Sequence, residues 1–254
     1  MKGSRVQISV SARKEVADDA AFFFVRSGKA DGSYEHTDWY SADPDTGITT
    51  LGDLAFLCYL AANLADMTEN MQFIPLTSPA DRDWAAAWEL YLQAFPPKER
   101  RTEADHLRAL ADPRFHADAI RRSDRFVGIL YWWQGPAFRY VEYLAIRPDL
   151  RGQQLGSAIF GAFCRGERVI LEIDPPEDEI SVRRLGFYRR LGFHDCPLEY
   201  VHPSYSRPFE PHRLVLMGYP TPLDVREART LADFVREEVL RYTEHEQPAL
   251  PRIP

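Results

Sequence analysis

The apolar positions beyond residue 70 predict short strands that alternate with helices. Gln72–Leu76 is a strand-like run, and a helix is expected to begin at Asp81 or Asp83, because apolar residues then recur at helical spacing. These recurring positions are Trp84, Trp88, Tyr91, Leu92 and Phe95. Pro96-Pro97 ends the helix, since proline lacks the backbone N–H that a helix interior needs.

The same patterns continue to the end of the chain. Alternating or continuous apolar runs predict strands, and helical spacing of apolar residues predicts helices. The expected strands are Phe126–Trp133, Phe138–Ile146, Arg168–Ile173, Leu198–Val201 and Arg213–Met217. The expected helices are Ser157–Cys164, Asp178–Arg190 and Leu231–Tyr242. Gln134-Gly135-Pro136 is typical of a turn between the first two strands.

Residues 1–70 have a pattern of their own. Val6–Val10 alternates at period two, and Ala21–Val25 is a second strand-like run. Ser27–Thr46 is rich in Gly, Asp, Ser and Pro and is expected to be mostly loop. An amphipathic helix is expected near residues 54–64, and its apolar face must be buried either on the core or against a second copy in a homodimer.

These elements together predict an α+β fold. Strands joined by both hairpins and helical crossovers favour a mixed sheet that is flanked by helices. We expect three parts: an N-terminal α/β extension of unknown role at 1–70, a main domain at 71–246 and a C-terminal tail at 247–254.

Charge and composition narrow the classes of partner. The net charge is −7, of which residues 1–70 contribute −5 (six Lys/Arg against eleven Asp/Glu). An acidic balance argues against a nucleic-acid-binding surface and favours cationic partners. Three widely spaced cysteines indicate a reducing cytoplasm, and no apolar run is long enough to cross a membrane. The histidines have no ligand-like spacing, so no metal site is expected.

The run from Glu142 to Ser157 carries the strongest chemical signal. A strand ends at Pro148, and Gly152 and Gly156 then allow a tight turn into a helix start. Backbone N–H groups at such a start bind anions, and Arg147 and Arg151 add positive charge. A pyrophosphate would suit this loop. Taken alone, the run also fits an ordinary strand–loop–helix connection.

A second segment, Gly186-Phe187-Tyr188-Arg189-Arg190-Leu191-Gly192-Phe193, follows about thirty residues later. In this order, with a strand between them, the two segments resemble the GNAT superfamily of acyl-CoA-dependent N-acyltransferases. The similarity to bacterial members extends to Ala94–Arg100 and Leu171–Pro176. The resemblance implies a mixed, centrally splayed sheet and acetyl-CoA as the co-substrate.

The resemblance also implies which residues bind the coenzyme. The family's pyrophosphate loop corresponds here to Arg151, Gly152, Gln153, Gln154, Leu155, Gly156 and Ser157. Gln154 departs from the pattern, because the family normally has glycine there. The family's splayed strand corresponds to residues 141–146, and its backbone would hold the pantetheine and the thioester oxygen near Leu144, Ala145 and Ile146.

Three side chains are candidates for proton transfer. Tyr188 stands where the family has its general acid, which would protonate the leaving thiolate. Glu142 and Glu172 are the candidate bases that would take a proton from the acceptor amine. The alternatives are a tyrosine that merely packs at a helix end and strand carboxylates that are solvated or ion-paired. Ser181 stands where the family often has asparagine.

The resemblance implies an N-acetyltransferase that acts on a primary amine by direct attack in a ternary complex. The acidic chain favours a small cationic acceptor molecule over nucleic acid. Three other interpretations stay open: a catalytically idle acyl-CoA-binding regulatory module, a protein or peptide N-acetyltransferase, and a tRNA-acetylating toxin, which the acidic charge balance disfavours.

Overall fold

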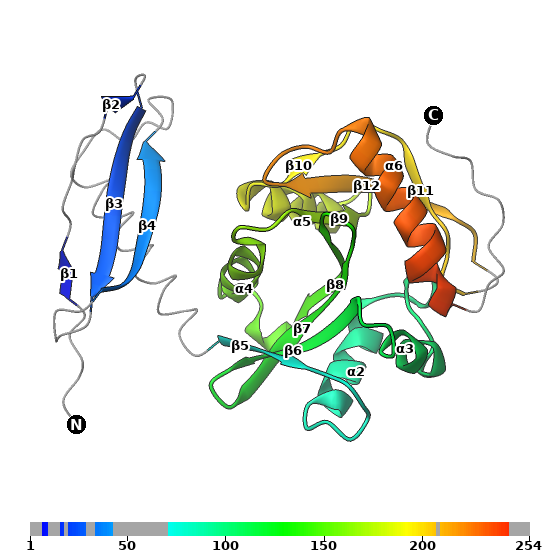
Figure 1. The fold of residues 1–254 in the computed structure, drawn as a ribbon. Coiled ribbons are helices and arrows are strands. Elements are labelled where there is room, and N and C mark those ends of the chain that lie inside the picture. The colour runs from blue at the N-terminus through cyan, green and yellow to red at the C-terminus, as the bar shows by residue number, and fades with distance from the viewer. Residues whose placement is uncertain are drawn as a thin grey trace. The chain divides into compact units, whose positions relative to one another are not determined.

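The computed structural model describes residues 71–206 and 209–243, together with the backbone of four strands near the N-terminus (Figure 1). The chain divides into two compact units, Met1–Met67 and Thr68–Pro254. No helix among the described residues is long and apolar enough to span a membrane.

The first unit contains an antiparallel sheet around one long strand. Its strands are β1 (Gln7–Ser9), β2 (Val16–Ala17), β3 (Ala20–Gly28) and β4 (Tyr34–Ala42), and β3 pairs with the other three. The two strands expected near residues 6–10 and 21–25 are confirmed. The expectation that Ser27–Thr46 is mostly loop was wrong, because β4 occupies residues 34–42. Tyr, Thr and Trp in that stretch favour a strand and outweigh its loop-like composition. The helix expected near 54–64 and the tail at 247–254 lie outside the described residues.

The second unit is a mixed sheet with helices on both faces. Its strands are β5 (Met71–Pro75), β6 (Phe115–Arg122), β7 (Arg125–Gln134), β8 (Arg139–Ile146), β9 (Val169–Ile173), β10 (His194–Asp195), β11 (Tyr200–His202) and β12 (His212–Tyr219). Its α-helices are α2 (Trp84–Ala94), α3 (Glu103–Ala109), α4 (Leu155–Cys164), α5 (Glu179–Arg190) and α6 (Val225–Phe234). A π-helical turn (Val235–Val239) and a 3₁₀ turn (Leu240–Tyr242) extend α6.

The centre of the sheet is where its two halves separate. Strands β5 to β8 pair antiparallel in sequence, and β9 pairs antiparallel with β12. Between the halves, β8 and β9 are parallel and pair only through Arg139–Val169, Tyr140–Ile170 and Val141–Leu171. Beyond these pairs the two strands diverge. The expected α+β fold with a mixed, centrally splayed sheet is therefore confirmed.

Aromatic side chains attach helices to both faces of the sheet. On one face, Tyr91 of α2 packs edge-on against Tyr143 of β8, at 4.9 Å between ring centroids, and Phe234 of α6 packs against Trp133. On the other face, Phe163 of α4 packs against Trp132, the neighbour of Trp133 on β7. Successive residues of a strand point to opposite faces, so the two tryptophans serve two different helix layers.

Local sequence signals explain where several helices begin and end. Asp178 accepts hydrogen bonds from the backbone N–H groups of Ile180 and Ser181, and the Ser181 hydroxyl in turn accepts one from the Asp178 N–H. This capping box starts α5. Helix α2 ends before Pro96-Pro97, as expected from the two prolines.

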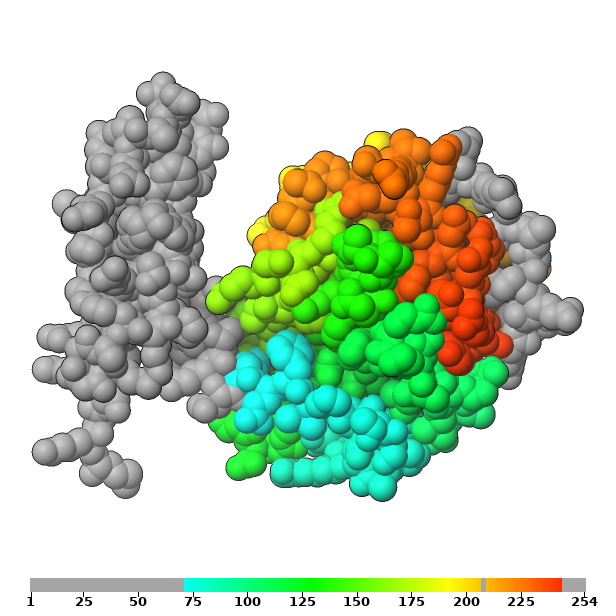
Figure 2. Space-filling model, viewed as in Figure 1, coloured from blue at the N-terminus to red at the C-terminus, as the bar shows by residue number. Residues whose placement is uncertain are grey.

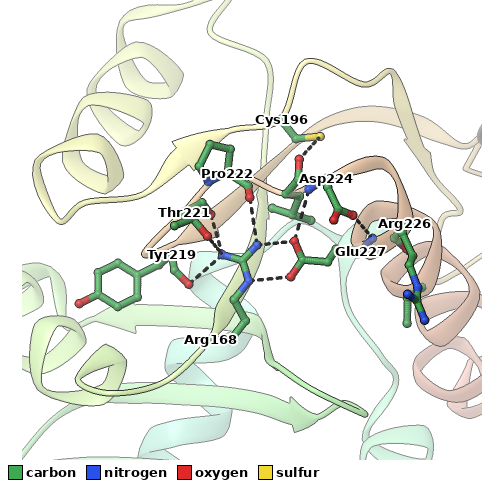
Figure 3. A network of polar contacts seen from close by, with 10 residues as sticks. Arg168, Cys196, Tyr219, Thr221, Pro222, Asp224, Arg226 and Glu227 are labelled. Carbon is green, nitrogen blue, oxygen red and sulfur yellow. Dashed lines mark hydrogen bonds and ion pairs between the residues drawn. The ribbon is translucent and has the colours of Figure 1, made fainter.

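A polar network joins the start of β9 to the start of α6 (Figure 3). The Arg168 guanidinium donates to both carboxylate oxygens of Glu227, at 2.9 and 2.8 Å, and to the carbonyl oxygens of Tyr219 and Thr221. Such a bidentate pair fixes the angle at which two elements meet. In the space-filling view, the orange and red C-terminal segment lies against the green middle part of the chain (Figure 2).

Candidate active site

Divergence of β8 and β9 leaves two backbone edges without a strand partner. Residues Tyr143–Ile146 of β8 stay paired with β7 on their other side, and Glu172 and Ile173 of β9 stay paired with β12. Leu144, Ala145 and Ile146, the residues expected to hold the pantetheine, lie on the β8 edge of this opening. An extended ligand can add to such an edge as an extra strand would.

A β-bulge sets the position of Glu142 at the point of divergence. Tyr131 pairs with Tyr143 and Trp132 pairs with Val141, so Glu142 is the extra residue on β8. Further along, a Cβ atom on Gly128 of β7 would lie 2.4 Å from the Ala145 carbonyl oxygen. Only glycine therefore permits this close approach of the two strands beside the opening.

The loop after β8 turns the chain into α4. The Arg147 guanidinium pairs with Asp149, at 3.0 Å from Nε to Oδ1, and the Arg151 Nε donates to the Ile146 carbonyl oxygen at 3.1 Å. Gly152 and Gln154 both have positive φ, at +78° and +59°. Position 154, where the family normally has glycine, therefore has a left-handed backbone conformation. This conformation strains the backbone of glutamine but not that of glycine.

The first turn of α4 presents unpaired backbone donors. The Ala158 N–H bonds to the Gln154 carbonyl oxygen at 3.1 Å and is the first N–H of the helix to do so. The N–H groups of Leu155, Gly156 and Ser157 therefore have no partner within the helix. They point out of the helix start, together with the positive end of its dipole, and can bind an anion.

Tyr188 of α5 lies among aromatic rings. Its own ring packs edge-on against Phe160, Phe187 and Phe193 at 5.0 to 5.7 Å between centroids. Burial raises the pKa of the Tyr188 phenol to about 12, although Arg184 one turn earlier acts to lower it. The phenol therefore keeps its proton near neutral pH, as a general acid must.

A cavity of about 340 Å³ lies on the side of the opening where Glu142 and Glu172 project. Segment 94–99, strands β8 and β9, helix α5 and the β11–β12 hairpin form its walls. Its lining residues are Ala94, Phe95, Pro96, Lys98, Glu99, Tyr140, Val141, Glu142, Tyr143, Glu172, Ile173, Asp174, Arg184, His202, Tyr205, His212 and Leu214.

Glu142 is held by one ion pair and two hydrogen bonds. Its side chain is buried and forms an ion pair with Arg101, at 2.7 Å from Nη1 to Oε1. The Tyr205 hydroxyl donates to the same oxygen at 2.6 Å, and the Trp133 indole N–H donates to Oε2 at 2.7 Å. Both oxygens of the Glu142 carboxylate are therefore already engaged by side chains of the protein.

Glu172 has the opposite surroundings. Its side chain is 6% exposed, and Oε1 has no hydrogen-bond partner among the described residues. Burial raises the pKa of Glu172 to about 8, and the Glu142 charge adds to this effect, while the Tyr200 and Tyr140 phenols act against it. Glu172 is thus neutral at pH 7 and titrates slightly above it.

Other candidate groups do not join this site. Trp132 stacks on His116 and bonds to Asp118, and Trp133 lies in the core, so neither of these β7 tryptophans lines the cavity. Burial raises the pKa of Cys164 to about 12, which is the reverse of an activated thiol. Within the described residues, no group of three or more metal-ligating side chains is placed to hold an ion.

Four residues of the site carry no signal in the sequence. Arg101, His202, Tyr205 and His212 reach Glu142, Glu172 or the cavity from segments that match no motif. Aromatic residues and histidines near short strands are common in proteins. Only the contacts made in the folded protein identify these four residues as part of the site.

Comparisons with known proteins agree with this geometry. Residues 84–193 match the sequence profile of the Acetyltransferase (GNAT) family. A putative acetyltransferase, YjbC of Bacillus subtilis (strain 168), is 29% identical over 109 residues. That match covers 42% of this chain and 55% of the relative, so the chain is similar to about half of that protein's length.

Two solved structures are also similar. A putative GNAT family acetyltransferase from Bacteroides thetaiotaomicron is 26% identical, with a TM-score of 0.60, over 65% of this chain and 96% of that one. A GNAT family acetyltransferase from Elizabethkingia anophelis, solved with acetyl-CoA bound, is 13% identical, with a TM-score of 0.42, over 61% of this chain and 99% of that one.

Proposed function

Because the chain belongs to the GNAT acetyltransferase family through residues 84–193, we propose that it moves an acetyl group from acetyl-CoA to a primary amine of a small cationic molecule. The transfer occurs by direct attack in a ternary complex. The observation that carries the proposal is the opening between β8 and β9, which lies next to three unpaired N–H groups at the start of α4.

The coenzyme is assigned to the opening and to the loop that follows β8. Its pyrophosphate lies on the N–H groups of Leu155, Gly156 and Ser157, with Arg151, Gly152, Gln153 and Gln154 forming the preceding turn. The pantetheine lies along the free edge at Leu144–Ile146, where a backbone N–H polarises the thioester carbonyl. A Cβ atom on Gly156 would lie at ordinary contact distance, 3.7 Å, from Ile146 and Phe187, so this first turn of α4 packs directly against those two side chains.

The acceptor is assigned to the cavity beside Glu172. Four carboxyl groups line this cavity, and three of them have cationic partners: Glu99 with Lys98, Asp174 with Arg184, and Glu142 with Arg101. Glu172 is the fourth. An ammonium group is therefore the ligand that would give Glu172 the cationic partner that the other three carboxyl groups already have.

Proton transfer is assigned to Glu172, which lines the cavity, and to Tyr188, which stands where the family has its general acid. The ammonium gives one proton to ionised Glu172 and becomes a nucleophile, whose nitrogen forms the C–N bond as the C–S bond breaks. The Tyr188 phenol protonates the departing thiolate, and the second proton lost by the nitrogen restores the phenol. Glu172 rather than Glu142 is assigned as the base, because both oxygens of Glu142 are already engaged by an ion pair and two hydrogen bonds.

The experiment is a thiol-release assay with acetyl-CoA across amines, polyamines, aminoglycosides and peptides. We expect acceptor-dependent thiol release, greatest with a small cationic amine, and its near-complete loss in Glu172→Gln. Acetyl-CoA that stabilises the protein without any acceptor-dependent release would favour an idle regulatory module. Preferential acetylation of a peptide would favour a protein N-acetyltransferase.

A further inference from the structure

His202 on β11 faces Glu172 across a buried contact. Its side chain is 2% exposed, and its Nε2 lies 3.6 Å from the Glu172 Oε2. Both side chains line the cavity assigned to the acceptor. The separation is slightly beyond hydrogen-bond length, as is common for catalytic contacts that tighten when substrate binds.

The other nitrogen of the ring fixes its protonation. The His202 Nδ1 lies 2.5 Å from the Pro203 carbonyl oxygen, which can only accept a hydrogen bond. Nδ1 therefore carries a proton, and in the neutral ring Nε2 is an acceptor. Burial lowers the pKa of His202 to about 3, with His212 and Arg101 acting in the same direction, so the ring is neutral.

The surroundings of Glu172 agree with a shared proton. An acceptor nitrogen faces one oxygen, Oε2, while the other, Oε1, is buried without a partner in the described part of the chain. The groups that face this carboxyl are Glu142 and Tyr140 on β8 and Tyr200 and His202 on β11. None of them is a cation that would hold Glu172 ionised.

We propose that His202 is a positioning residue: its Nε2 accepts the proton that the neutral Glu172 carboxyl carries on Oε2 and thereby fixes the orientation of that carboxyl in the wall of the acceptor cavity. This rests on the proposed function, in which Glu172 takes a proton from that amine. The neutral ring does not itself touch the amine or the thioester. It sets the pH at which Glu172 becomes able to act as the base.

The test measures the ionisation of Glu172 directly, by ¹³C NMR of the glutamate side chains in the full chain, with Glu172→Gln identifying the signal. His202→Asn keeps a donor near Nδ1 and loses the acceptor at Nε2. The lost bond stabilised the protonated form, so the titration midpoint should fall by about half to one pH unit. His202→Gln, which retains an acceptor near Nε2, should restore the midpoint of about 8.

His212→Asn is the matched control, because His212 lines the same cavity and its Nε2 lies 3.9 Å from Oε1 of Glu99 rather than beside Glu172. It should leave the Glu172 midpoint unchanged. A rise of the midpoint in His202→Asn would identify an imidazolium–carboxylate pair and overturn the proposal, and an unchanged midpoint would also overturn it. So would an equal fall in the His212→Asn control, since added hydration would then explain the shift.

A second readout separates this inference from the proposed function. The rise of kcat/KM with pH should follow the Glu172 midpoint and move to lower pH in His202→Asn by the same amount. If the NMR midpoints move as expected but no amine is acetylated, the assignment of the proton between Glu172 and His202 stands and the proposed function fails.

Discussion

Replacing Glu172 with glutamine should make the protein more stable, and increasingly so as the pH rises. The native carboxyl titrates near 8 and the ordinary value is 4.5. Between these values the native state binds one proton that the unfolded state does not. The contribution of this carboxyl to the free energy of unfolding is therefore fully present below about pH 4.5 and is lost as the pH rises to 8.

The size of the effect follows from a difference of one proton. The free energy of unfolding should fall by about 1.4 kcal/mol per pH unit in this window, relative to a variant without the group. Glu172→Gln is isosteric and uncharged, so its advantage over the parent should grow by up to about 4 kcal/mol from pH 5 to pH 8. Above pH 8 the advantage should become constant.

Urea unfolding at half-unit steps from pH 4 to pH 9 measures this difference. Glu89→Gln is the control, because Glu89 is exposed on α2 and accepts a hydrogen bond only from Gln93 among the interactions found for it. Its curve should run parallel to that of the parent. Parallel curves for Glu172→Gln and the parent would refute the reasoning, because Glu172 would then be ionised in the native state.

Three further predictions concern other parts of the site. Tyr188→Phe should lower kcat by about 10²-fold with little change in acetyl-CoA affinity, as steady-state kinetics and calorimetry would show; an unchanged kcat would move the acid elsewhere. At the left-handed position 154, Gln154→Gly should keep the stability and acetyl-CoA binding of the parent, whereas β-branched Gln154→Val should lose about 1 kcal/mol or more and weaken binding; equal behaviour of both variants would contradict a strained loop. A chain beginning at Met71 should fold and be stabilised by acetyl-CoA in a thermal shift assay, and an insoluble product would show that residues 1–70 belong to the fold or to an interface.

Local signals in the sequence predicted most elements of the second unit. Apolar periodicity, proline and glycine correctly indicated one helix, two strands and a loop. These are the helix Trp84–Ala94, the strands Arg125–Gln134 and Arg139–Ile146, and the loop before α4. By contrast, β6 (Phe115–Arg122) gave no expectation, because its alternation is interrupted by buried Ile120 and Arg121 side by side.

The chemistry around the two carboxylates could not be predicted, because it depends on contacts between distant segments. Glu142 and Glu172 are both strand glutamates in the sequence. Arg101 ion-pairs with the first from 41 positions away, and His202 lies 30 positions from the second. No periodicity or motif encodes such pairings. Only the folded structure therefore distinguishes Glu172 from Glu142 as the better candidate base.

Mass spectrometry of the acceptor, combined with thiol release, tests the central claim most directly. The parent protein, acetyl-CoA and a panel of small cationic amines are incubated at pH 8, with Glu172→Gln and Tyr188→Phe alongside. We predict one acetyl group on an amine, one thiol released per acetyl transferred, and strongly reduced rates in both variants. Thermal stabilisation by acetyl-CoA without any acetylated amine or peptide would contradict the assignment of this chain as an acetyltransferase.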